Sequence, residues 1–428
     1  MQRIYGTAFE SKEALDEHMR LIEEAKKRDH RKLGKDLDLF TMVPDYAPGS
    51  PFFTPKGTLV YNALLNFIRE KYRKFGYHEV ITPQIFDTEL YHCSGHYQNY
   101  KENMFFTETD GREFSVKPMN CPGHCLLFKS KKKSYRELPY RVADFGRLHR
   151  YERSGVMHGL TRVRTFCQDD AHVFCRLSQL QDEISNTMVF LNEVYNELGM
   201  PDYKIFLSTR PEKRMGSDEV WDKSEQALKD ALDNLNLDYE INEGDGAFYG
   251  PKLDIMFVDA LKRDWQLGTL QADFNLPEAF DLSFVNEDNT NERPVMLHRA
   301  VLGSLERFFG VYLEHTGGRL PLWMMPTQIK ILNVSEKHMG FCEKLSQKFT
   351  EAGLRADFDS RGEKLGFKIR EAQLQQTPYM ITCGDDEVES GKIAVRLRTG
   401  EVEKNLDLDD FIKNLKEKIE TKSLDLKL

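Results

Sequence analysis

Two cysteines and a histidine lie within five consecutive positions of KPMNCPGHCLLF, the stretch from Lys117 to Phe128. Sulfur and imidazole at this spacing are compatible with a zinc site, and the two cysteines with a redox pair. A third interpretation is a helix start, because Pro122 suits the first helical turn. Cys121 would then lie at the positive end of the helix dipole, which favours its thiolate, while Cys125 would pack into the core.

A second group of reactive residues lies in HRYERSG, residues 149–155, and TRVRTFCQDDAH, residues 161–172. Arg150 and Glu152 are two positions apart, so on an extended strand they point to the same face. An arginine can bind a phosphate or carboxylate through two N–H groups, and a carboxylate can accept from an amino group. The pair could therefore hold both ends of an adenylate. The alternative is an ion pair on the surface.

Glycine-rich phosphate loops do not explain nucleotide binding in this sequence. No GxxxxGK[ST] motif occurs, and GDGAFYGP, residues 244–251, has the wrong spacing for a dinucleotide fingerprint and leads into a proline and a strand. We interpret it as a tight turn, so that side-chain cations would have to hold a nucleotide. The basic run KSKKKSYR, residues 129–136, is either solvated surface or an RNA contact.

Composition places these motifs in a large globular chain. Its 428 residues predict a large domain with a smaller companion, and 40% hydrophobic with 30% charged residues leaves room for a real core. Seven cysteines, odd in number and scattered, argue against a disulfide framework. The sequence has no secretory signal and no apolar run long enough to cross a membrane, so we expect a cytoplasmic protein. A net charge of −9 means that a nucleic acid would be bound by local patches.

Periodicity predicts the elements that position the motifs. Residues 11–32 form one charged connector helix, and Thr58 caps a helix that carries apolar residues 59–68. A short strand follows at 77–81. Residues 141–151 and 161–174 form an antiparallel hairpin. Further strands are predicted at 252–258 and 266–274, and a helix from 301 to 312 stops at Gly317 and Gly318. A mixed, mainly antiparallel sheet accounts for this order.

A domain boundary is predicted at LPLWMMPTQ, residues 320–328. Beyond it, strands alternate with helices, which is typical of a small α/β domain, and a hairpin and a helix at 408–418 close the chain. We therefore expect a linker helix at 1–35, a catalytic domain at 36–325 and a terminal domain at 326–428.

The chain resembles the class II aminoacyl-tRNA synthetases, in which RxE on one strand, an aromatic residue on the next and an arginine in a late helix recur. It is similar over its whole length to the threonyl-tRNA synthetase family. The segments that carry the resemblance are KPMNCPGH, HRYERSGVMHGLTRVRTFCQDDAHVFC, STRPEKRMGSDEVWDKSEQAL, EGDGAFYGPKLDI and PVMLHRAVLGSLERFFG. It implies an α+β catalytic domain on a mainly antiparallel sheet with flanking helices, followed by a small α/β anticodon-binding domain. The implied activity joins threonine to the 3′ end of tRNA(Thr) at the expense of ATP.

The resemblance also implies a metal site. One zinc ion per subunit would be held by Cys121, His172 and His298, and three protein ligands leave a position open for substrate. Threonine would coordinate through its amino and hydroxyl groups, with Asp170 accepting the hydroxyl proton. Valine cannot complete that shell, and a site that must bond a hydroxyl discriminates far better than an apolar pocket. Serine can complete it, so its rejection needs a separate proofreading step.

For ATP, the resemblance implies Arg150 at the α-phosphate, Glu152 at the adenine amino group and Phe166 stacked on the base. Arg307 would cover the other face of the base and reach the γ-phosphate, and Mg²⁺ would accompany the nucleotide. His96 would relay a proton during transfer to tRNA. The further implied residues are Arg162 at the tail phosphates and, around the aminoacyl group, Met119, Gln168, Tyr249, Lys252, Gln266 and Gln271.

In the terminal domain, the resemblance implies that Arg370, Glu387 and Arg396 face anticodon bases. Gly362 stands where asparagine is expected in some relatives, which puts one base contact in doubt. The cations Lys364, Lys368 and Arg398 are expected to touch phosphate or solvent. A homodimer is implied, because the helix and strand within 59–83 resemble the interface segment of this class.

Many relatives carry an N-terminal proofreading domain, whereas this sequence begins at the linker helix. We therefore expect it to charge tRNA with threonine but not to hydrolyse seryl-tRNA in cis. Two alternatives stay open: a synthetase for serine or proline, and a non-catalytic paralogue that binds RNA or protein. Against the paralogue, Arg150, Glu152, Arg307 and the three metal positions are all present.

Overall fold

The N-terminal connector consists of two helices. The computed structural model describes residues 6–428, so residues 1–5 of the predicted linker lie outside the described residues. Helix α1 (Lys12–Arg28) ends before Asp29, and α2 (His30–Asp36) begins after it. The Asp29 carboxylate accepts from the Arg31 N–H at 2.8 Å and caps α2. The single helix predicted over 11–32 is therefore wrong, because an aspartate favours an N-cap over a helix interior.

An eight-stranded sheet organises the larger domain, and its inner pairs are antiparallel while the outer pairs β13–β12 and β8–β3 are parallel. This matches the predicted mainly antiparallel sheet. In spatial order the strands are β13 (Glu240–Asn242), β12 (Tyr203–Ser208), β14 (Lys252–Val258), β15 (Asp264–Asp273), β18 (Val295–Ala300), β11 (Asp170–Cys175), β8 (Tyr140–Asp144) and β3 (His78–Glu79).

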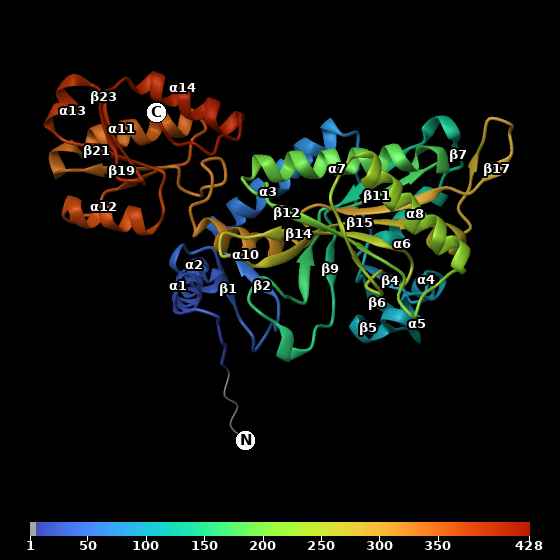
Figure 1. The fold of residues 1–428 in the computed structure, drawn as a ribbon. Helices are drawn as coiled ribbons and strands as arrows, with labels where there is room; N and C mark the ends of the chain where they lie inside the picture. The colour runs from blue at the N-terminus through green and yellow to red at the C-terminus, as the bar shows by residue number, and fades with distance from the viewer. Residues whose placement is uncertain (1–5) are drawn as a thin grey trace.

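The sheet buries different side chains on its two faces. Val173 and Leu297 belong to the main core, whereas Phe174 and Met296 belong to a second core that includes Cys125. Strand residues alternate between faces, so each strand serves both cores. Four helices contribute side chains to the main core: α3 (Pro55–Lys74), α7 (Leu180–Glu197), α8 (Asp218–Asn234) and α10 (Leu305–Thr316). Of these, α3 and α7 run along the top of the larger domain in Figure 1. The second core contains side chains of α6 (Cys121–Lys129) and α9 (Asn275–Ala279).

The predicted hairpin exists as two short ladders. Strand β8 pairs with β11, and β9 (Arg147–His149) pairs with β10 (Thr165–Cys167), both antiparallel. Arg150 and Glu152 lie beyond the end of β9, so the prediction that they sit on a strand is wrong. The chain turns there, because the Glu152 N–H donates to the Arg150 carbonyl at 3.0 Å. The strand prediction for 252–258 is confirmed, and 266–274 becomes 264–273.

Two helix starts differ from the predictions. Helix α3 is capped by Thr54, whose hydroxyl accepts from the Gly57 N–H at 3.1 Å, rather than by Thr58, because Pro55 can occupy the first turn. The late helix starts at Leu305 behind its cap Ser304. Residues 301–303 are not helical, because their N–H groups donate to the buried Asp169 carboxylate and Gly303 has φ 72°. Its predicted end is confirmed, with Gly317 at φ 60°. The strand predicted at 77–81 shrinks to β3.

Small sheets complete the larger domain. They are the hairpin β1 (Phe40–Met42) with β2 (Pro51–Phe53), the sheet β4 (Ile85–Asp87), β6 (Arg112–Val116), β5 (Phe105–Thr109), and the sheet β17 (Asn291–Glu292), β16 (Phe284–Val285), β7 (Lys133–Ser134). Two short helices, α4 (Glu89–Cys93) and α5 (His96–Tyr100), lie beside them. Among the described residues, no helix has the length and apolar character needed to span a bilayer.

The terminal domain has its own sheet and its own hydrophobic core (Figure 1). Its first three strands are parallel and the last two are joined to them antiparallel, which confirms the predicted α/β alternation. The strands, in spatial order, are β20 (Ala356–Asp359), β19 (Ile329–Asn333), β21 (Tyr379–Cys383), β22 (Ile393–Leu397) and β23 (Val402–Leu406). The helices are α11 (Met339–Glu351), α12 (Leu365–Leu374), α13 (Asp385–Ser390), which the sequence pattern did not reveal, and α14 (Leu408–Glu420).

Candidate active site

A cavity of about 430 Å³ opens on the face of the large sheet that carries α6. Eleven of the residues singled out from the sequence line it: Met119, Cys121, Arg150, Gln168, Asp170, His172, Tyr249, Lys252, Gln266, Gln271 and His298. Tyr100, Asp245, Phe248, Thr269 and Arg299 also line it and were not singled out.

The register of the sheet creates this concentration of polar groups. His172 lies directly opposite His298, His298 opposite Gln271, and Gln271 opposite Lys252. Opposite residues on paired strands point to the same face at close range. Four strands therefore present one continuous row of polar side chains across the sheet.

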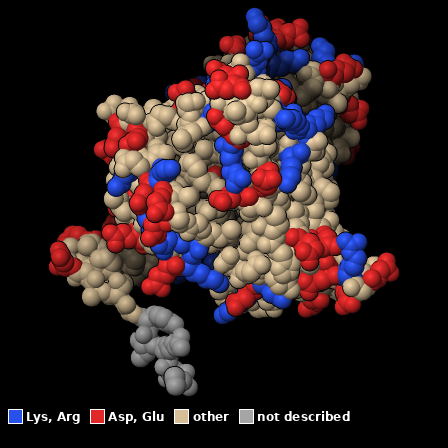
Figure 2. All heavy atoms as spheres, turned by 90° about the vertical axis from the view of Figure 1, so that its right-hand side faces the viewer, with Lys and Arg blue, Asp and Glu red and all other residues tan. Residues whose placement is uncertain are grey.

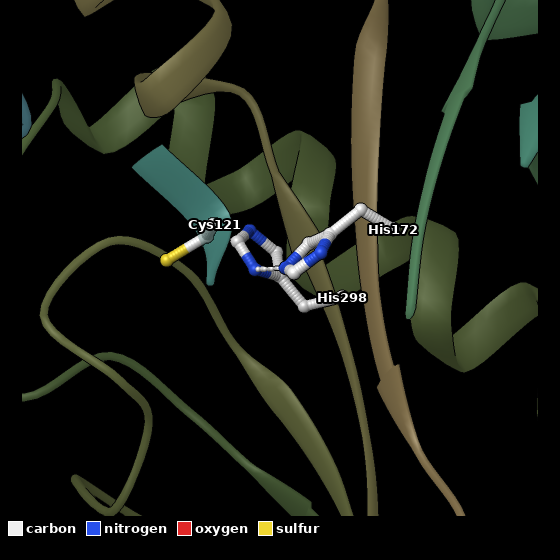
Figure 3. A group of neighbouring side chains, drawn as sticks. All are labelled: Cys121, His172 and His298. Atoms are coloured by element: carbon white, nitrogen blue, oxygen red, sulfur yellow. Dashed lines mark hydrogen bonds between the residues drawn. The ribbon is translucent and has the colours of Figure 1, made fainter. Parts of the chain in front are cut away.

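Cys121, His172 and His298 form a buried cluster whose ligand atoms all lie within 4.8 Å of one another (Figure 3). The Nε2 atom of His172 and the Nδ1 atom of His298 are 2.9 Å apart. The His298 Nε2 atom lies 2.7 Å from an Asp273 carboxylate oxygen. One thiol and two imidazoles, with a carboxylate behind an imidazole, form a donor set that suits zinc. The residues present therefore fit the ion that the family resemblance implies.

The thiol of Cys121 is not activated by the helix start alone. It lies in the first turn of α6, as predicted, but burial raises the pKa of Cys121 well above its usual value, and nearby carboxylates raise it further. The prediction that the helix dipole favours a thiolate is therefore wrong for the protein by itself. A dipole at a helix end contributes about 1 kcal/mol, which cannot offset full burial of a charge. A bound cation would reverse this balance.

The neighbours of Cys121 in α6 have separate roles. Cys125 is fully buried, with its sulfur 3.8 Å from the sulfur of Met296, which confirms its place in the core. His124 is also fully buried, and its Nδ1 atom lies 2.6 Å from the Nδ1 atom of His172. It thus contacts a member of the cluster from behind, a relationship that the local sequence could not reveal.

Asp170 is positioned beside the cluster of Cys121, His172 and His298. Its carboxylate accepts from the Asn120 side chain at 3.0 Å and lies 3.8 Å from the His172 ring. Burial raises the pKa of Asp170, while the charge of His124 and the bond from Asn120 act in the opposite direction. A buried carboxylate at the cavity wall can accept a hydrogen bond from a substrate hydroxyl.

The opposite wall of the cavity is held by hydrogen bonds among predicted pocket residues. The Tyr249 hydroxyl donates to the Gln271 side chain at 2.6 Å, and its ring lies 5.0 Å from that of His298. Lys252 is paired with Asp254 at 2.9 Å, and Gln266 donates to the same carboxylate. These bonds fix the positions of the groups that would contact an aminoacyl moiety.

Two arginines are anchored to backbone carbonyls at the other end of the site. Arg150 donates to the Pro118 carbonyl at 3.1 Å, with its guanidinium 5.0 Å from the centre of the Phe166 ring. Arg307 donates to the carbonyls of Gln266 and Thr161 at 3.1 and 3.0 Å. Burial lowers the pKa of Arg307, and its neighbour Arg162 lowers it further. The charges of Arg307 and Arg162 together raise the local positive potential, which favours binding of an anion.

The remaining predicted nucleotide residues, Glu152, Arg162 and Phe166, do not line this cavity. Glu152 forms an ion pair with Arg162 at 3.0 Å. An ion pair was the alternative considered for Glu152, but with Arg150 as its partner. Phe166 is 5% exposed and packs with Leu148 and Val163. The Arg150 guanidinium lies over its ring, at the position where a base would stack.

His96 is placed behind the cavity wall. It is fully buried, with Nδ1 2.8 Å from the Ser94 hydroxyl and Nε2 3.0 Å from the Met119 sulfur. Burial lowers the pKa of His96 to about 3, so the ring is neutral near pH 7. It contacts Met119, which lines the cavity, rather than lining the cavity itself.

The predicted anticodon residues lie on three elements of the terminal domain. Arg370 is on α12, Glu387 on α13 and Arg396 on β22. The Glu387 carboxylate accepts from the Gly384 N–H at 2.8 Å, and Arg396 donates to the Gly400 carbonyl at 3.1 Å. Within residues 6–428 the structure records no bond among the three.

Two cations predicted to touch phosphate or solvent donate to oxygens of the protein. Lys368 is 1% exposed and donates to the Asn333 side chain at 2.8 Å and the Asp359 carbonyl at 3.0 Å. Arg398 donates to the Leu320 carbonyl at 2.9 Å, and burial lowers its pKa to about 10. The prediction for Lys368 is wrong, because its buried ammonium group satisfies two oxygens of the protein. Arg398 is partly exposed, so its contact with phosphate or solvent stays a prediction. Lys364 is exposed, as expected.

The basic run at 129–136 does not form a surface of one sign. Lys131 and Lys132 are exposed, but Lys133 is buried with its ammonium group 4.7 Å from the centre of the Tyr140 ring. Figure 2 shows the side of the molecule that is on the right in Figure 1, where β7 lies, and its lysines and arginines are interspersed with carboxylates. The interpretation as solvated surface is favoured.

Comparison with known families defines the class. Residues 100–316 match the tRNA synthetase class II core domain (G, H, P, S and T), and residues 328–418 match an anticodon binding domain. The larger domain is therefore a class II tRNA synthetase core, and the smaller one is an anticodon-binding domain. A prolyl-tRNA synthetase structure from Giardia lamblia, 16% identical, shares this fold with a TM-score of 0.72 over 94% of this chain and 82% of that one.

Relatives with higher sequence identity identify the family within this class. A threonine–tRNA ligase from Bdellovibrio bacteriovorus is 63% identical over 99% of this chain, and one from Thermotoga sp. (strain RQ2) is 50% identical over 100%. A structure described as the RNA binding domain of threonyl-tRNA synthetase from Cryptosporidium parvum is 46% identical, with a TM-score of 0.88 over 91% of this chain and 98% of that one. The chain belongs to the threonyl-tRNA synthetase family. It spans 64% and 66% of the lengths of the two bacterial relatives.

Proposed function

We propose that this protein activates threonine with ATP and transfers it to the 3′ end of tRNA(Thr), with a zinc ion selecting threonine over valine. The observation that carries the proposal is the buried cluster of Cys121, His172 and His298, which opens into the same cavity as Asp170 and Arg150. The names of the relatives over the whole chain support the same reaction.

Amino-acid selection would take place at the metal end of the cavity. When bound to this cluster, zinc would supply a Lewis-acid site for the amino and hydroxyl groups of threonine. Asp170, held by Asn120, would accept the hydroxyl proton in a hydrogen bond, and the valine methyl group cannot donate one. Tyr249 and Gln271 would bound the space left for the amino acid. Such a site rejects an analogue that lacks the hydroxyl by about 10⁴-fold, compared with about 10²-fold for an apolar pocket.

Activation would take place at the arginine end. The threonine carboxylate attacks the α-phosphorus of ATP, the bond to the β-phosphate oxygen breaks, and pyrophosphate leaves. Arg150 would bridge the carboxylate and the α-phosphate, since its anchor at Pro118 directs it along the cavity wall. Arg307 and Arg162 would bind the outer phosphates together with Mg²⁺. Anchoring before the reaction lowers the cost of orienting these cations in the transition state.

Binding of adenine requires two local changes at the predicted contacts. Glu152 would exchange its bond to Arg162 for the adenine amino group, and Arg150 would leave the face of Phe166 so that the base can stack there. Arg162 is then free for the phosphates. His96 would take the proton from the ribose hydroxyl only after the Met119 side chain, whose sulfur lies 3.0 Å from Nε2, has moved aside.

For tRNA recognition, we propose that Arg370, Glu387 and Arg396 contact the anticodon and that the protein is a homodimer. The match of residues 328–418 to an anticodon binding domain supports the first part. The exposed side chains of Leu59 and Ile81, at 47% and 94% exposure, support the second, because they lie on the segment proposed as the interface.

A pyrophosphate exchange assay with threonine, valine, serine and proline tests the proposal. We expect threonine to support the fastest exchange and removal of zinc to abolish the preference over valine. Fastest exchange with serine or proline would indicate another synthetase. Absence of exchange with every amino acid, in protein that binds tRNA, would favour a non-catalytic paralogue.

We also infer that these 428 residues do not hydrolyse seryl-tRNA(Thr). The support is that the two matched regions are a synthetase core and an anticodon binding domain, neither of which is a proofreading module. Incubation with pre-formed seryl-tRNA(Thr) tests this inference. Deacylation that scales with enzyme concentration would contradict it.

A further inference from the structure

We propose that His124 is a positioning residue for the metal site. It holds the His172 ring in the tautomer that leaves the Nε2 atom free to bind the metal. The inference rests on the proposed function, because it assumes that the cluster binds zinc. His124 is not a fourth ligand. Its Nδ1 atom lies 2.6 Å from the Nδ1 atom of His172, on the side of that ring away from His298.

The two nitrogens of His172 face different partners. Nε2 lies 2.9 Å from the His298 Nδ1 atom, inside the metal cluster, and Nδ1 faces His124. A neutral imidazole carries one N–H, and a metal binds the nitrogen without it. If Nε2 binds the metal, Nδ1 must carry the proton and donate it to His124. The Nδ1 atom of His124 must then be the acceptor.

The far side of His124 fits this direction. With Nδ1 as acceptor, the His124 proton is on Nε2, and this atom is buried without a hydrogen-bond partner among the described residues. Its neighbour is the Asp144 carboxylate at 3.9 Å. Asp144 is held in place by the Thr82 hydroxyl at 2.7 Å and by Lys117 at 3.3 Å. A fixed negative group opposite Nε2 favours the proton on that atom, and hence an acceptor at Nδ1.

The second imidazole of the cluster has a simpler arrangement that serves as an internal comparison. His298 Nε2 meets the Asp273 carboxylate directly at 2.7 Å, so its Nδ1 is left for the metal. Behind His172 the corresponding position is taken by His124, which contacts the ring at 2.6 Å and has the Asp144 carboxylate 3.9 Å from its own Nε2 atom, outside hydrogen-bond distance. His298 is therefore backed by a carboxylate and His172 by a histidine. Partners of this kind typically change metal affinity by about 10- to 100-fold when removed.

Three variants separate positioning from simple packing. His124→Leu fills the space but removes the acceptor, while His124→Asn restores an acceptor near the position of Nδ1. Cys125→Ala is the matched control, because Cys125 is the next residue of α6, fully buried, and contacts Met296 rather than the cluster. Zinc affinity is measured by competition with a chromophoric chelator, and the ligand field by the visible spectrum of Co²⁺-loaded protein. Thermal unfolding of each variant is recorded alongside.

We expect His124→Leu to weaken zinc binding by about 10- to 100-fold and to alter the Co²⁺ spectrum, with substantial recovery in His124→Asn. Cys125→Ala should lower the unfolding temperature and leave zinc affinity within about twofold of wild type, because it removes packing in α6 but neither a proposed ligand nor a hydrogen-bond partner of one. Equal losses of affinity in His124→Leu and His124→Asn would reduce His124 to a packing residue and overturn the proposal. Wild-type affinity in His124→Leu would overturn it as well.

A measurement on the wild-type holoprotein covers the case in which His124→Leu does not fold. In ¹⁵N-histidine spectra of the zinc form, we expect the His172 ring to carry its proton on Nδ1 and the His124 ring on Nε2. The opposite tautomer of His124 would contradict the proposal. The failures are distinguishable: a wild-type protein that binds no zinc refutes the proposed zinc selection, whereas normal zinc binding by His124→Leu refutes only the role of His124.

Discussion

His30 contacts Glu314 across 284 positions of sequence, with its Nδ1 atom 2.6 Å from the Glu314 carboxylate. Its Nε2 atom accepts from the Leu160 N–H at 3.0 Å, so the proton is on Nδ1, and Nδ1 donates to Glu314. One fully buried ring thus joins α2, the loop before β10 and α10, the helix that carries Arg307. Helix α2 of the linker is therefore packed against the larger domain.

Removal of this ring is expected to destabilise the larger domain. His30→Ala removes a hydrogen bond to the buried Glu314 carboxylate, which keeps Arg263 as a partner, and the loss of such a bond typically costs about 1.5–3 kcal/mol. Denaturant unfolding measures the loss. The control Arg20→Ala breaks an exposed pair on α1 and should change stability by less than about 1 kcal/mol. Equal effects of both variants would contradict the role of His30.

The same contact predicts a pH dependence. Burial alone would raise the pKa of Glu314, but the bonds from His30 and Arg263 outweigh it, and the pKa is lowered from 4.5. A carboxyl with a depressed pKa in the folded state stabilises the protein above its unfolded pKa, and this stability is lost as pH falls through the lower folded value. Wild-type stability should therefore fall below about pH 4.5 through this group. In Glu314→Gln that part of the acid dependence should disappear from unfolding curves measured between about pH 3 and 6.

Loss of the thiol ligand is expected to remove amino-acid selection. Cys121→Ser should lower zinc content after dialysis and reduce discrimination between threonine and valine from about 10⁴-fold to about 10²-fold or less in pyrophosphate exchange. Cys342→Ser, a buried thiol in the terminal domain, is the control and should keep both properties. Full discrimination in zinc-free Cys121→Ser would rule out selection by the metal.

Arg307 is expected to act on the reaction more than on the fold. Arg307→Ala should reduce threonine-dependent exchange by about 10²- to 10³-fold, because it removes a preorganised cation from the phosphate end. Arg293→Ala, at a partly exposed surface arginine, is the control and should retain activity. The thermal midpoint decides whether the loss is structural, since Arg307 also bridges the carbonyls of Gln266 and Thr161. Wild-type exchange in Arg307→Ala would favour the non-catalytic alternative.

Substitutions of Lys368 and Arg370, two cations of α12, are expected to have different effects, the first on stability and the second on tRNA binding. Lys368→Ala leaves the Asn333 and Asp359 oxygens without their donor and should cost about 1–3 kcal/mol of stability in the terminal domain. Arg370→Ala should leave stability unchanged, raise the KM for tRNA(Thr) and spare pyrophosphate exchange. Aminoacylation and denaturant unfolding of both variants test this. A tRNA defect confined to Lys368→Ala would reverse the assignment.

The sequence by itself determined the local structure and the candidate residues. Apolar spacing predicted the α/β alternation of the terminal domain, Pro122 predicted the start of α6 at Cys121, and Gly317 predicted the end of α10. Local signals predicted helix boundaries less well where a second residue nearby could also cap a helix. Asp29 divided the predicted linker helix, and Thr54 replaced Thr58 as a cap, because neighbouring capping residues compete over a few tenths of a kcal/mol to about 1 kcal/mol.

Only the tertiary structure decided which side chains meet. His172 and His298 are 126 positions apart, and they share a cavity because β11 and β18 pair in the register that sets them opposite each other. A shift of one residue would turn both rings to the other face of the sheet. That register is fixed by the burial of alternate residues such as Val173 and Leu297 in the main core. The site therefore depends on long-range packing, which no local pattern records.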